Sequence, residues 1–246
     1  SEITLAEIFA EKNYKTGIFG KWHLGDNYPS RPSDQGFQES LIHLAGGIGQ
    51  VGDFTNYYAG NESYYDPALW YNNEIKKYEG YCSDIFTDEA LKFIEQNKSN
   101  QFFCYLSFNA PHTPLQVPEK YYDLYKDIDP SNFYEEVTSE MTERDVNDAK
   151  KIYGMVTNID ENFGKLLYKL EELDIKENTI VIFLTDNGPQ QTRYVSNLRG
   201  LKSQVYNGGI KVPLYFSYPK LYKKAEDIDF FGAHIDVLPT LSKLCN

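Results

Sequence analysis

The sequence predicts an α/β fold in which helices cover both faces of a mostly parallel sheet. Apolar, uncharged runs at 102–108 and 179–185 are typical of strands that are buried on both faces. Stretches with apolar residues at helical spacing alternate with such runs, which is the order that produces a parallel sheet. The chain has 246 residues, of which 41% are hydrophobic, so we expect one domain spanning 1–246.

The first part of the chain begins with a helix and a strand. Residues 3–12 have apolar side chains at helical spacing behind a candidate N-cap, Thr4, and residues 15–19 are a short apolar strand. Residues 26–81 are rich in Gly, Asn and Tyr without strong periodicity, so we expect an irregular insertion with only short strands. A helix with one apolar face is predicted over 83–96.

The second part contains the longest periodic pattern. Apolar residues over 142–173 recur at alternating steps of three and four, which predicts a helix that covers the sheet and leads into the strand at 179–185. A loop bearing Gly and Lys at 196–209 precedes a strand at 210–217 and a helix at 231–244.

Charge, hydrophobicity and cysteine spacing argue against several classes of partner and of protein. A net charge of −12 argues against binding to nucleic acid or to an anionic membrane surface. No apolar run is long enough to span a bilayer. The three cysteines have no metal-type spacing and indicate no disulfide framework.

Two oxygen-bearing side chains follow the strand at 179–185. Asp186 and Asn187 come directly before Gly188 and Pro189, which turn the backbone out of the sheet. Ligands bind at the carboxyl ends of strands in open α/β sheets, and hard oxygen donors suit Ca²⁺ or Mg²⁺. An ordinary Asp-Asn-Gly turn is the alternative.

A cation and a histidine follow the first strand. Lys21 and His23 lie between Gly20 and Gly25, which let the backbone come close to a ligand. The pair is suited to holding an anionic oxygen. Exposed side chains of a surface turn are the alternative.

His112 follows the strand at 102–108 in the same manner. Pro111 and Pro114 restrict the loop around it, which is useful where a side chain must be held in place. The alternative is a loop histidine that satisfies its own hydrogen bonds and has no role in function.

Three more cations surround the Gly-rich loop near the C-terminus. Arg199, Lys202 and Lys211 concentrate positive charge locally in a chain of net charge −12, which indicates an anion site. Of the three, Lys211 is the one we expect to be an ordinary surface residue.

Together these motifs resemble the sulfatase family, the type I arylsulfatases of the alkaline phosphatase superfamily. The resemblance covers nearly the whole chain, and its motifs stand in the family's order. They are Gly20-Lys21-Trp22-His23-Leu24-Gly25, Ala110-Pro111-His112-Thr113-Pro114, Asp186-Asn187-Gly188, Arg199-Gly200-Leu201-Lys202, Gly208-Gly209-Ile210-Lys211-Val212-Pro213 and His234-Ile235-Asp236-Val237-Leu238-Pro239-Thr240.

The resemblance implies a metal and an anion site. Asp186 and Asn187 match ligands of the family's divalent metal, which is usually calcium, with Mg²⁺ as a second possibility. Lys21 and Lys202 match the lysines that hold the sulfate oxygens.

The resemblance also assigns the histidines. His23 matches the histidine beside the nucleophile, and His112 matches the one that protonates the leaving oxygen. His234 and Asp236 match a further family signature, and we expect them to be structural.

One departure concerns the nucleophile, which in the family is a formylglycine made from Cys or Ser in a Cys/Ser-x-Pro-x-Arg motif. Pro29-Ser30-Arg31 imitates the end of this motif, but Asn27 occupies the nucleophile's position and both lie after His23 rather than before it. Ser30 has Asp34 where Arg is required, and no cysteine has Pro two residues on. We therefore expect the formylglycine and a pair of Asp metal ligands to precede this chain, which is expected to be a fragment truncated at both ends and inactive alone.

The expected activity is hydrolysis of an organic or glycan sulfate ester. The alternatives are a phosphonate or phosphate ester hydrolase of the same superfamily and a non-catalytic metal- or glycan-binding relative. By analogy with the family we expect a sulfated small molecule or polysaccharide as the partner, in the periplasm or outside the cell. Aromatic side chains of 53–81 could stack on sugar rings or pack within the insertion: Tyr57, Tyr58, Tyr64, Tyr65, Trp70 and Tyr71.

Overall fold

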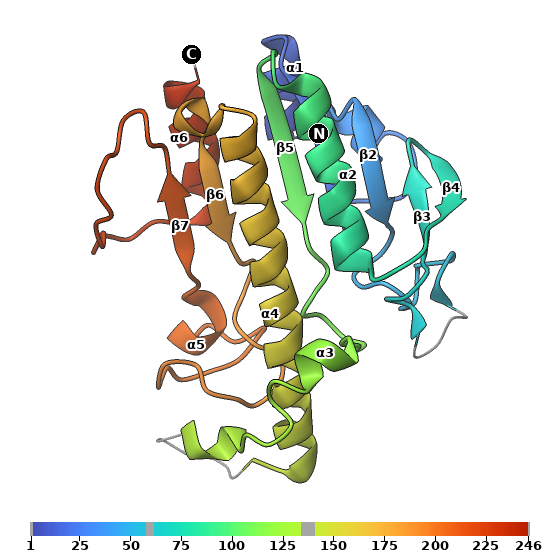
Figure 1. Ribbon diagram of the computed structural model, residues 1–246, viewed down its shortest axis with the longest axis vertical. Coiled ribbons are helices and arrows are strands. Elements are labelled where there is room, and N and C mark those ends of the chain that lie inside the picture. Colours follow the sequence, from blue (N-terminus) through green and yellow to red (C-terminus); the bar gives the residue numbers. More distant parts are fainter. Residues whose placement is uncertain (1, 58–61, 134–140, 246) are drawn as a thin grey trace.

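The computed structural model describes residues 2–57, 62–133 and 141–245, so Tyr58 lies outside the described residues. Its main sheet has five strands in the order β4-β3-β2-β1-β5 (Figure 1). They are β1 (Lys15–Lys21), β2 (Glu39–His43), β3 (Ala68–Tyr71), β4 (Glu74–Lys77) and β5 (Phe102–Ser107). A separate two-stranded sheet pairs β6 (Val181–Leu184) with β7 (Leu214–Ser217).

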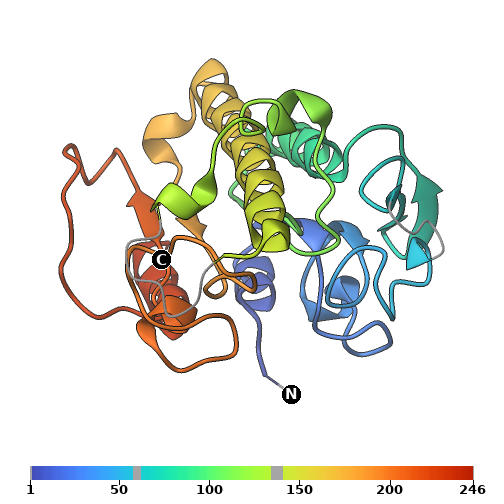
Figure 2. The ribbon, with the colours of Figure 1, turned by 90° about the horizontal axis from the view of Figure 1, so that it is seen from below.

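Helices lie on both faces of the main sheet, as the sequence predicts. In the views of Figures 1 and 2, α1 lies on one side of the sheet and α2 and α4 on the other. The helices are α1 (Leu5–Glu11), α2 (Cys82–Asn97), α3 (Glu119–Tyr122), α4 (Glu143–Glu172), α5 (Asn207–Ile210) and α6 (Val237–Leu244). Short 3-10 turns cover Pro32–Gln35, Pro130–Phe133, Lys176–Asn178 and His234–Asp236. No helix among the described residues is long and apolar enough to cross a membrane.

The three inner strands are parallel and divide the core by alternation. β1 pairs in parallel with β2 on one side and with β5 on the other. Phe19 and Leu41 point into the core beneath α2 and α4, whereas Ile18 and Ile42 belong to the second core cluster with α1. Because successive side chains of a strand face opposite sides, both clusters are built from the same two strands.

Residues 26–81 contribute three short strands to the main sheet. They contain β2, β3 and β4, and Leu41 of β2 is fully buried. The hairpin of β3 and β4 turns at Asn72 and Asn73, which both have positive φ, a backbone conformation that Asn tolerates better than most residues. These strands are short, and pairing with neighbours rather than local periodicity defines them.

The strand that follows α4 does not occupy a central position. β6 pairs only with β7, in antiparallel register, and all four of its residues are half-buried. Among the described residues no ladder joins it to β5, whose Tyr105 is 48% exposed. The expectation that the strand at 179–185 is buried on both faces was therefore wrong. The C-terminal strand also starts later than expected, at Leu214, because Ile210 ends α5 and Pro213 follows.

α4 connects the two sheets. Its Met155 and Ile159 pack in the core beneath the main sheet, and its Phe163 lies 5.4 Å from the ring of Phe183 in β6. Buried polar contacts tie it to α2 as well, because Asn158 and Asn162 both donate to the same carboxylate oxygen of Asp84. The helix therefore holds β6 beside the main sheet without a backbone ladder.

The fully buried His43 at the end of β2 should make stability depend on pH. Burial is the main cause that lowers its pKa from 6.5 to about 4. An unfolded His43 binds a proton as pH falls below about 6.5 and a folded one does not, so stability should decrease over this window. We expect His43 to account for a loss of about 2 kcal/mol between pH 7 and pH 5.

The measurement is urea unfolding of the wild type and of His43→Gln at both pH values. The variant should lose less stability on acidification, whatever its stability at pH 7. An equal loss in both proteins would show that His43 is not a buried neutral group.

Candidate active site

The site lies where the parallel strands end. β1 ends at Lys21, β2 ends at His43, and the loop carrying His112 follows β5. Parallel strands deliver their carboxyl ends to one edge of a sheet, so these side chains share that edge. Figure 2 looks at this end of the molecule, where the loops after β1 and β5 and the loops after β6 come together.

Lys21 carries a half-buried charge. Burial is the main cause that lowers the pKa of its ammonium group. The negative charge of Asp186 acts in the opposite direction, and the positive charge of Lys202 lowers the pKa further. The side chains of Lys21, Asp186 and Lys202 are thus close enough to influence one another, although they come from distant parts of the sequence.

His112 belongs to the same electrostatic cluster. Burial lowers its pKa first, and the nearby charges of Lys21 and Lys202 lower it further while Asp186 raises it. Its Nδ1 lies 2.8 Å from the carbonyl oxygen of Thr113. A carbonyl only accepts, so Nδ1 carries the proton and Nε2 of the neutral ring is left as an acceptor.

Buried hydrogen bonds fix the loop that carries His112. The hydroxyl of Tyr64 donates to the carbonyl oxygen of His112 at 2.7 Å and accepts from Nδ2 of Asn109 at 2.5 Å. Tyr64 is fully buried, so the loop is anchored to the core. Tyr64, one of the aromatic residues that the sequence analysis considered for stacking on sugar rings, therefore has a structural role.

Two adjacent glycines pack against the two histidines. A Cβ on Gly46 would lie 2.8 Å from Cε1 of His23, and one on Gly47 would lie 3.0 Å from Nδ1 of His112. His23, which is exposed, is thereby placed beside the loop of His112. Sequence analysis did not single out Gly46 and Gly47, which lie three and four residues after the end of β2.

The turn after β6 presents oxygen atoms that fit a hard cation in part. Asp186 Oδ1 accepts from the backbone N–H of Asn187 at 3.0 Å, and Asn187 Nδ2 donates to the carbonyl oxygen of Gly188 at 2.8 Å. The second oxygen of Asp186 and the amide oxygen of Asn187 have no hydrogen-bond partner among the described residues. Calcium takes six to eight oxygen ligands, and no cluster of three or more His, Cys, Asp or Glu side chains is found in the described ranges. Asp186 and Asn187 would therefore hold only one side of a calcium ion.

Lys202 is tied to this turn through the backbone. Its N–H donates to the carbonyl oxygen of Pro189 at 2.7 Å, and the N–H of Gly188 donates to that of Gly209 at 2.9 Å. A Cβ on Gly188 would lie 1.9 Å from the carbonyl oxygen of Gly208, so only glycine allows this approach. The Lys202 segment thus lies against the Asp186–Asn187 turn.

The other cations of this loop are placed differently. The guanidinium of Arg199 lies 3.8 Å from the ring centroid of Tyr206, an exposed cation–π contact. Lys211 is exposed. Of the three cations named from the sequence, Lys202 is the one whose charge acts on both Lys21 and His112.

His234 and Asp236 make contacts with the backbone. His234 Nε2 lies 2.9 Å from the carbonyl oxygen of Thr185, and Asp236 accepts from the backbone N–H of Ala233 at 2.7 Å. These contacts attach the start of α6 to the end of β6, next to Asp186.

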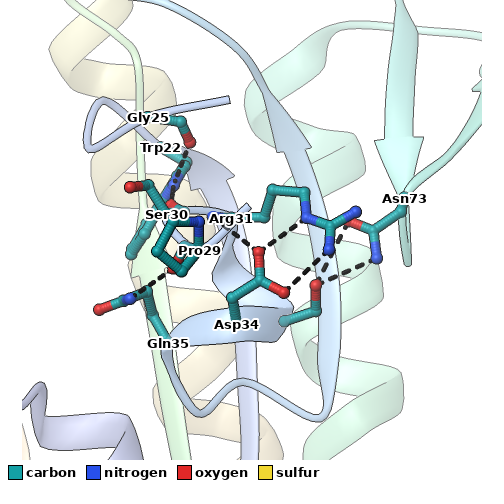
Figure 3. A network of polar contacts seen from close by, with 9 residues as sticks. Trp22, Gly25, Pro29, Ser30, Arg31, Asp34, Gln35 and Asn73 are labelled. Carbon is teal, nitrogen blue, oxygen red and sulfur yellow. Dashed lines mark hydrogen bonds and ion pairs between the residues drawn. The ribbon is translucent and has the colours of Figure 1, made fainter. Parts of the chain in front are cut away.

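Pro29-Ser30-Arg31 forms a structural turn (Figure 3). Nε1 of Trp22 donates to the carbonyl oxygens of Gly25 and Ser30, at 3.0 and 2.9 Å. Arg31 forms a two-pronged ion pair with Asp34 at 2.7 and 2.9 Å. The guanidinium of Arg31, at the end of the stretch that imitates the family's nucleophile motif, is therefore paired with a carboxylate of its own turn.

The cysteines are also unsuited to nucleophilic attack. Burial raises the pKa of the Cys82 thiol, and it raises that of Cys104 to about 12. Burial also raises the pKa of Cys245. A thiol is nucleophilic as its thiolate, which these environments disfavour.

Comparison with known proteins gives a consistent assignment. The sulfatase family model matches residues 1–246. An arylsulfatase of Hemicentrotus pulcherrimus is 30% identical, over 89% of this chain and 38% of its own length. The ulvan-active sulfatase of Formosa agariphila is 27% identical, over the whole of this chain and 47% of its own length.

A solved structure supports the same conclusion. The structure of Ps i-CgsB in complex with k-i-k-neocarrahexaose has a TM-score of 0.72 and 30% sequence identity, and the match covers 87% of this chain and 47% of that one. The chain thus spans about half the length of several relatives that it matches. Because the family model matches every residue of the sequence, this chain belongs to the sulfatase family.

Proposed function

We propose that the protein hydrolyses sulfate esters and that Lys21, Lys202 and His112 act on the sulfate group. The observation that carries this proposal is the cluster of half-buried positive charge beside Asp186 in a chain of net charge −12. Burying like charges together is unfavourable unless an anion joins them. Membership of the sulfatase family makes a sulfate ester the anion of choice.

The three side chains have complementary roles. Lys21 and Lys202 neutralise the negative charge of the sulfate oxygens, which is present both in the bound ester and in the transition state. His112 is fixed by its Nδ1 contact with Thr113, so Nε2 is the atom that can carry a proton to the departing alcohol oxygen. Its lowered pKa makes the protonated ring a stronger acid for this step. His23 completes the polar wall beside Gly46.

The covalent nucleophile is not among the cysteines described above. We propose a formylglycine contributed by a part of the protein outside residues 1–246, because relatives are about twice as long as this chain. When present, this group supplies the nucleophilic attack on sulfur. The residues described here bind the sulfate, orient it and exchange the proton.

Residues 1–246 should accordingly bind sulfate without turning over a sulfate ester. We expect no hydrolysis of 4-nitrophenyl sulfate above that of Lys21→Ala, and binding of inorganic sulfate that weakens about tenfold or more in Lys21→Ala or Lys202→Ala, because each removes one charged hydrogen-bond donor. Release of 4-nitrophenol and isothermal titration measure the two quantities.

Lys211→Ala is the matched control, because this lysine is exposed on the same segment of chain. It should bind sulfate as the wild type does. Turnover by the wild-type chain would overturn the assignment of the nucleophile, and equal sulfate affinity in all variants would overturn the anion site.

We also propose that Asp186 and Asn187 bind calcium at the edge of this site. Their free oxygen atoms are hard donors on one turn, and bound calcium would supply positive charge next to the sulfate. Two side chains are a small part of its usual shell, so the affinity of this chain should be low, in the millimolar range typical of weak sites.

Removing the carboxylate tests the metal site. Asp186→Ala should abolish calcium binding seen by isothermal titration, whereas Asp88→Ala, which removes an exposed carboxylate on α2, should leave it unchanged. Calcium binding that survives in Asp186→Ala would place the ion elsewhere. If Mg²⁺ displaces calcium when the two ions compete for the wild-type chain, Mg²⁺ would be the ion that this site prefers.

For the substrate we propose a sulfated glycan that extends along a groove beside His112. The groove, of about 770 Å³, begins at Thr113 and Pro114, the residues that follow His112. Tyr65 and Tyr122 line it, together with Lys151, for which no ion pair is found among the described residues. Aromatic faces and a free cation suit sugar rings that carry sulfate. The similarity to a protein solved with neocarrahexaose supports a carbohydrate of this kind.

Truncating the groove should separate glycan from sulfate binding. Tyr65→Ala is expected to weaken the binding of neocarrahexaose about five- to thirtyfold, since it removes one aromatic contact, while inorganic sulfate binds as before. Tyr168→Ala is the control, because Tyr168 is exposed on α4 outside the groove. Unchanged neocarrahexaose affinity in Tyr65→Ala would exclude this groove.

A further inference from the structure

A side chain from the loop after β2 reaches the residue that follows His112. Nε2 of Gln50 donates to the carbonyl oxygen of Thr113 at 2.8 Å and to its hydroxyl oxygen at 3.0 Å. The same carbonyl oxygen accepts from Nδ1 of His112 at 2.8 Å. A carbonyl oxygen has two lone pairs, so it can accept both hydrogen bonds at once. Gln50 and His112 are thus joined through one backbone atom.

The contact that His112 makes by itself is short in sequence and needs support. Its Nδ1 bonds to the carbonyl of the next residue, and that carbonyl belongs to the peptide group shared with Pro114, which has no N–H. The hydroxyl of Thr113 lies 3.5 Å from Nδ1, which is too long to replace the carbonyl. The hydrogen bond from Gln50 therefore supplies a fixed point for a peptide group that cannot donate.

Gln50 is itself held by the backbone of its loop. Its N–H donates to the carbonyl oxygen of Gly47 at 3.1 Å, and its carbonyl oxygen accepts from the N–H of Asp53 at 2.9 Å. Asp53 is fully buried, and its carboxylate accepts from the N–H of Gly49 at 2.8 Å and from the hydroxyl of Thr55 at 2.9 Å. The side chain of Gln50 therefore extends from a turn that buried hydrogen bonds hold in place.

The approach of the two side chains depends on Gly47. A Cβ at this position would lie 3.0 Å from Oε1 of Gln50 and 3.0 Å from Nδ1 of His112. The amide and the imidazole thus meet where any other residue would place its side chain. Two successive carbonyls of the His112 loop accept from side chains of 26–81, since Tyr64 donates to the carbonyl of His112 itself.

We propose that Gln50 is a positioning residue for His112. By holding the carbonyl of Thr113, it keeps the proton of the neutral ring on Nδ1 and leaves Nε2 as the free nitrogen. Without this hydrogen bond the carbonyl can turn away, and the ring can then adopt the other tautomer, in which Nε2 already holds a proton and cannot accept one. The inference rests on the proposed role of His112 in moving a proton at Nε2.

The tautomer of His112 gives a direct readout. In Gln50→Met the side chain keeps its length but loses the donor. At a pH where the ring is neutral, the ratio of the Nδ1–H form to the Nε2–H form should fall about fivefold, as expected for the loss of one ordinary hydrogen bond. The two ring nitrogen resonances of His112 in ¹⁵N spectra should then move toward each other. The chain has four histidines, and His112→Gln identifies the resonances.

Gln35→Met is the matched control. Nε2 of Gln35 also donates to a backbone carbonyl, that of Pro29 at 2.7 Å, outside the His112 loop. This variant should leave the resonances of His112 in place, and thermal unfolding establishes that both variants are folded. Unmoved resonances in Gln50→Met, or the same movement in Gln35→Met, would overturn the inference.

Sulfate binding separates this inference from the proposed function. Gln50→Met should bind inorganic sulfate within about twofold of the wild type, because Lys21 and Lys202 are unaltered. A loss as large as that of Lys21→Ala would indicate general damage to the site and would overturn the inference. If the wild-type chain binds no sulfate, the proposed function fails, and the His112 resonances still decide whether Gln50 positions the ring.

Discussion

Parallel pairing of β1 with β2 and β5 is the constraint on which the rest of this structure depends. It brings the ends of three strands to one edge, so Lys21, His43 and the loop of His112 meet although they are far apart in sequence. The same pairing makes β1 the centre of the core, with Phe19 on one side and Ile18 on the other. A slip of one residue in its register would exchange these faces and turn Lys21 away from the site.

The second constraint is electrostatic. Lys21 and Lys202 bring positive charge together in a partly buried place, and both charges lower the pKa of the neighbouring His112. The negative charge of Asp186 offsets part of the repulsion between these positive charges, and a bound sulfate would offset more. The −12 charge of the whole chain repels anions in general, so the local cations must offset an unfavourable overall field at this site.

The β6 side of the site is held by close backbone contacts instead of a continuous sheet. Gly188 and Gly209 are joined by a hydrogen bond, and Lys202 is joined to Pro189 in the same way. His234 adds a contact to the carbonyl oxygen of Thr185. These contacts place Asp186 and Lys202 together. The glycines of the C-terminal motif therefore help to position Lys202 and do not make the loop flexible.

The sequence by itself determined the class of fold and the long helices, and it supplied the hypothesis for the residues of the candidate site, because helical periodicity and motifs at strand ends are local properties. Tertiary structure alone decided that β2 belongs to the main sheet, that β6 pairs with β7, and that Lys202 rather than Arg199 or Lys211 joins the charge cluster. It also decided the burial of His43 and the packing of Gly46 and Gly47 against the histidines. Strand pairing, burial and close approach depend on residues distant in the chain, and no local pattern records which of them will meet.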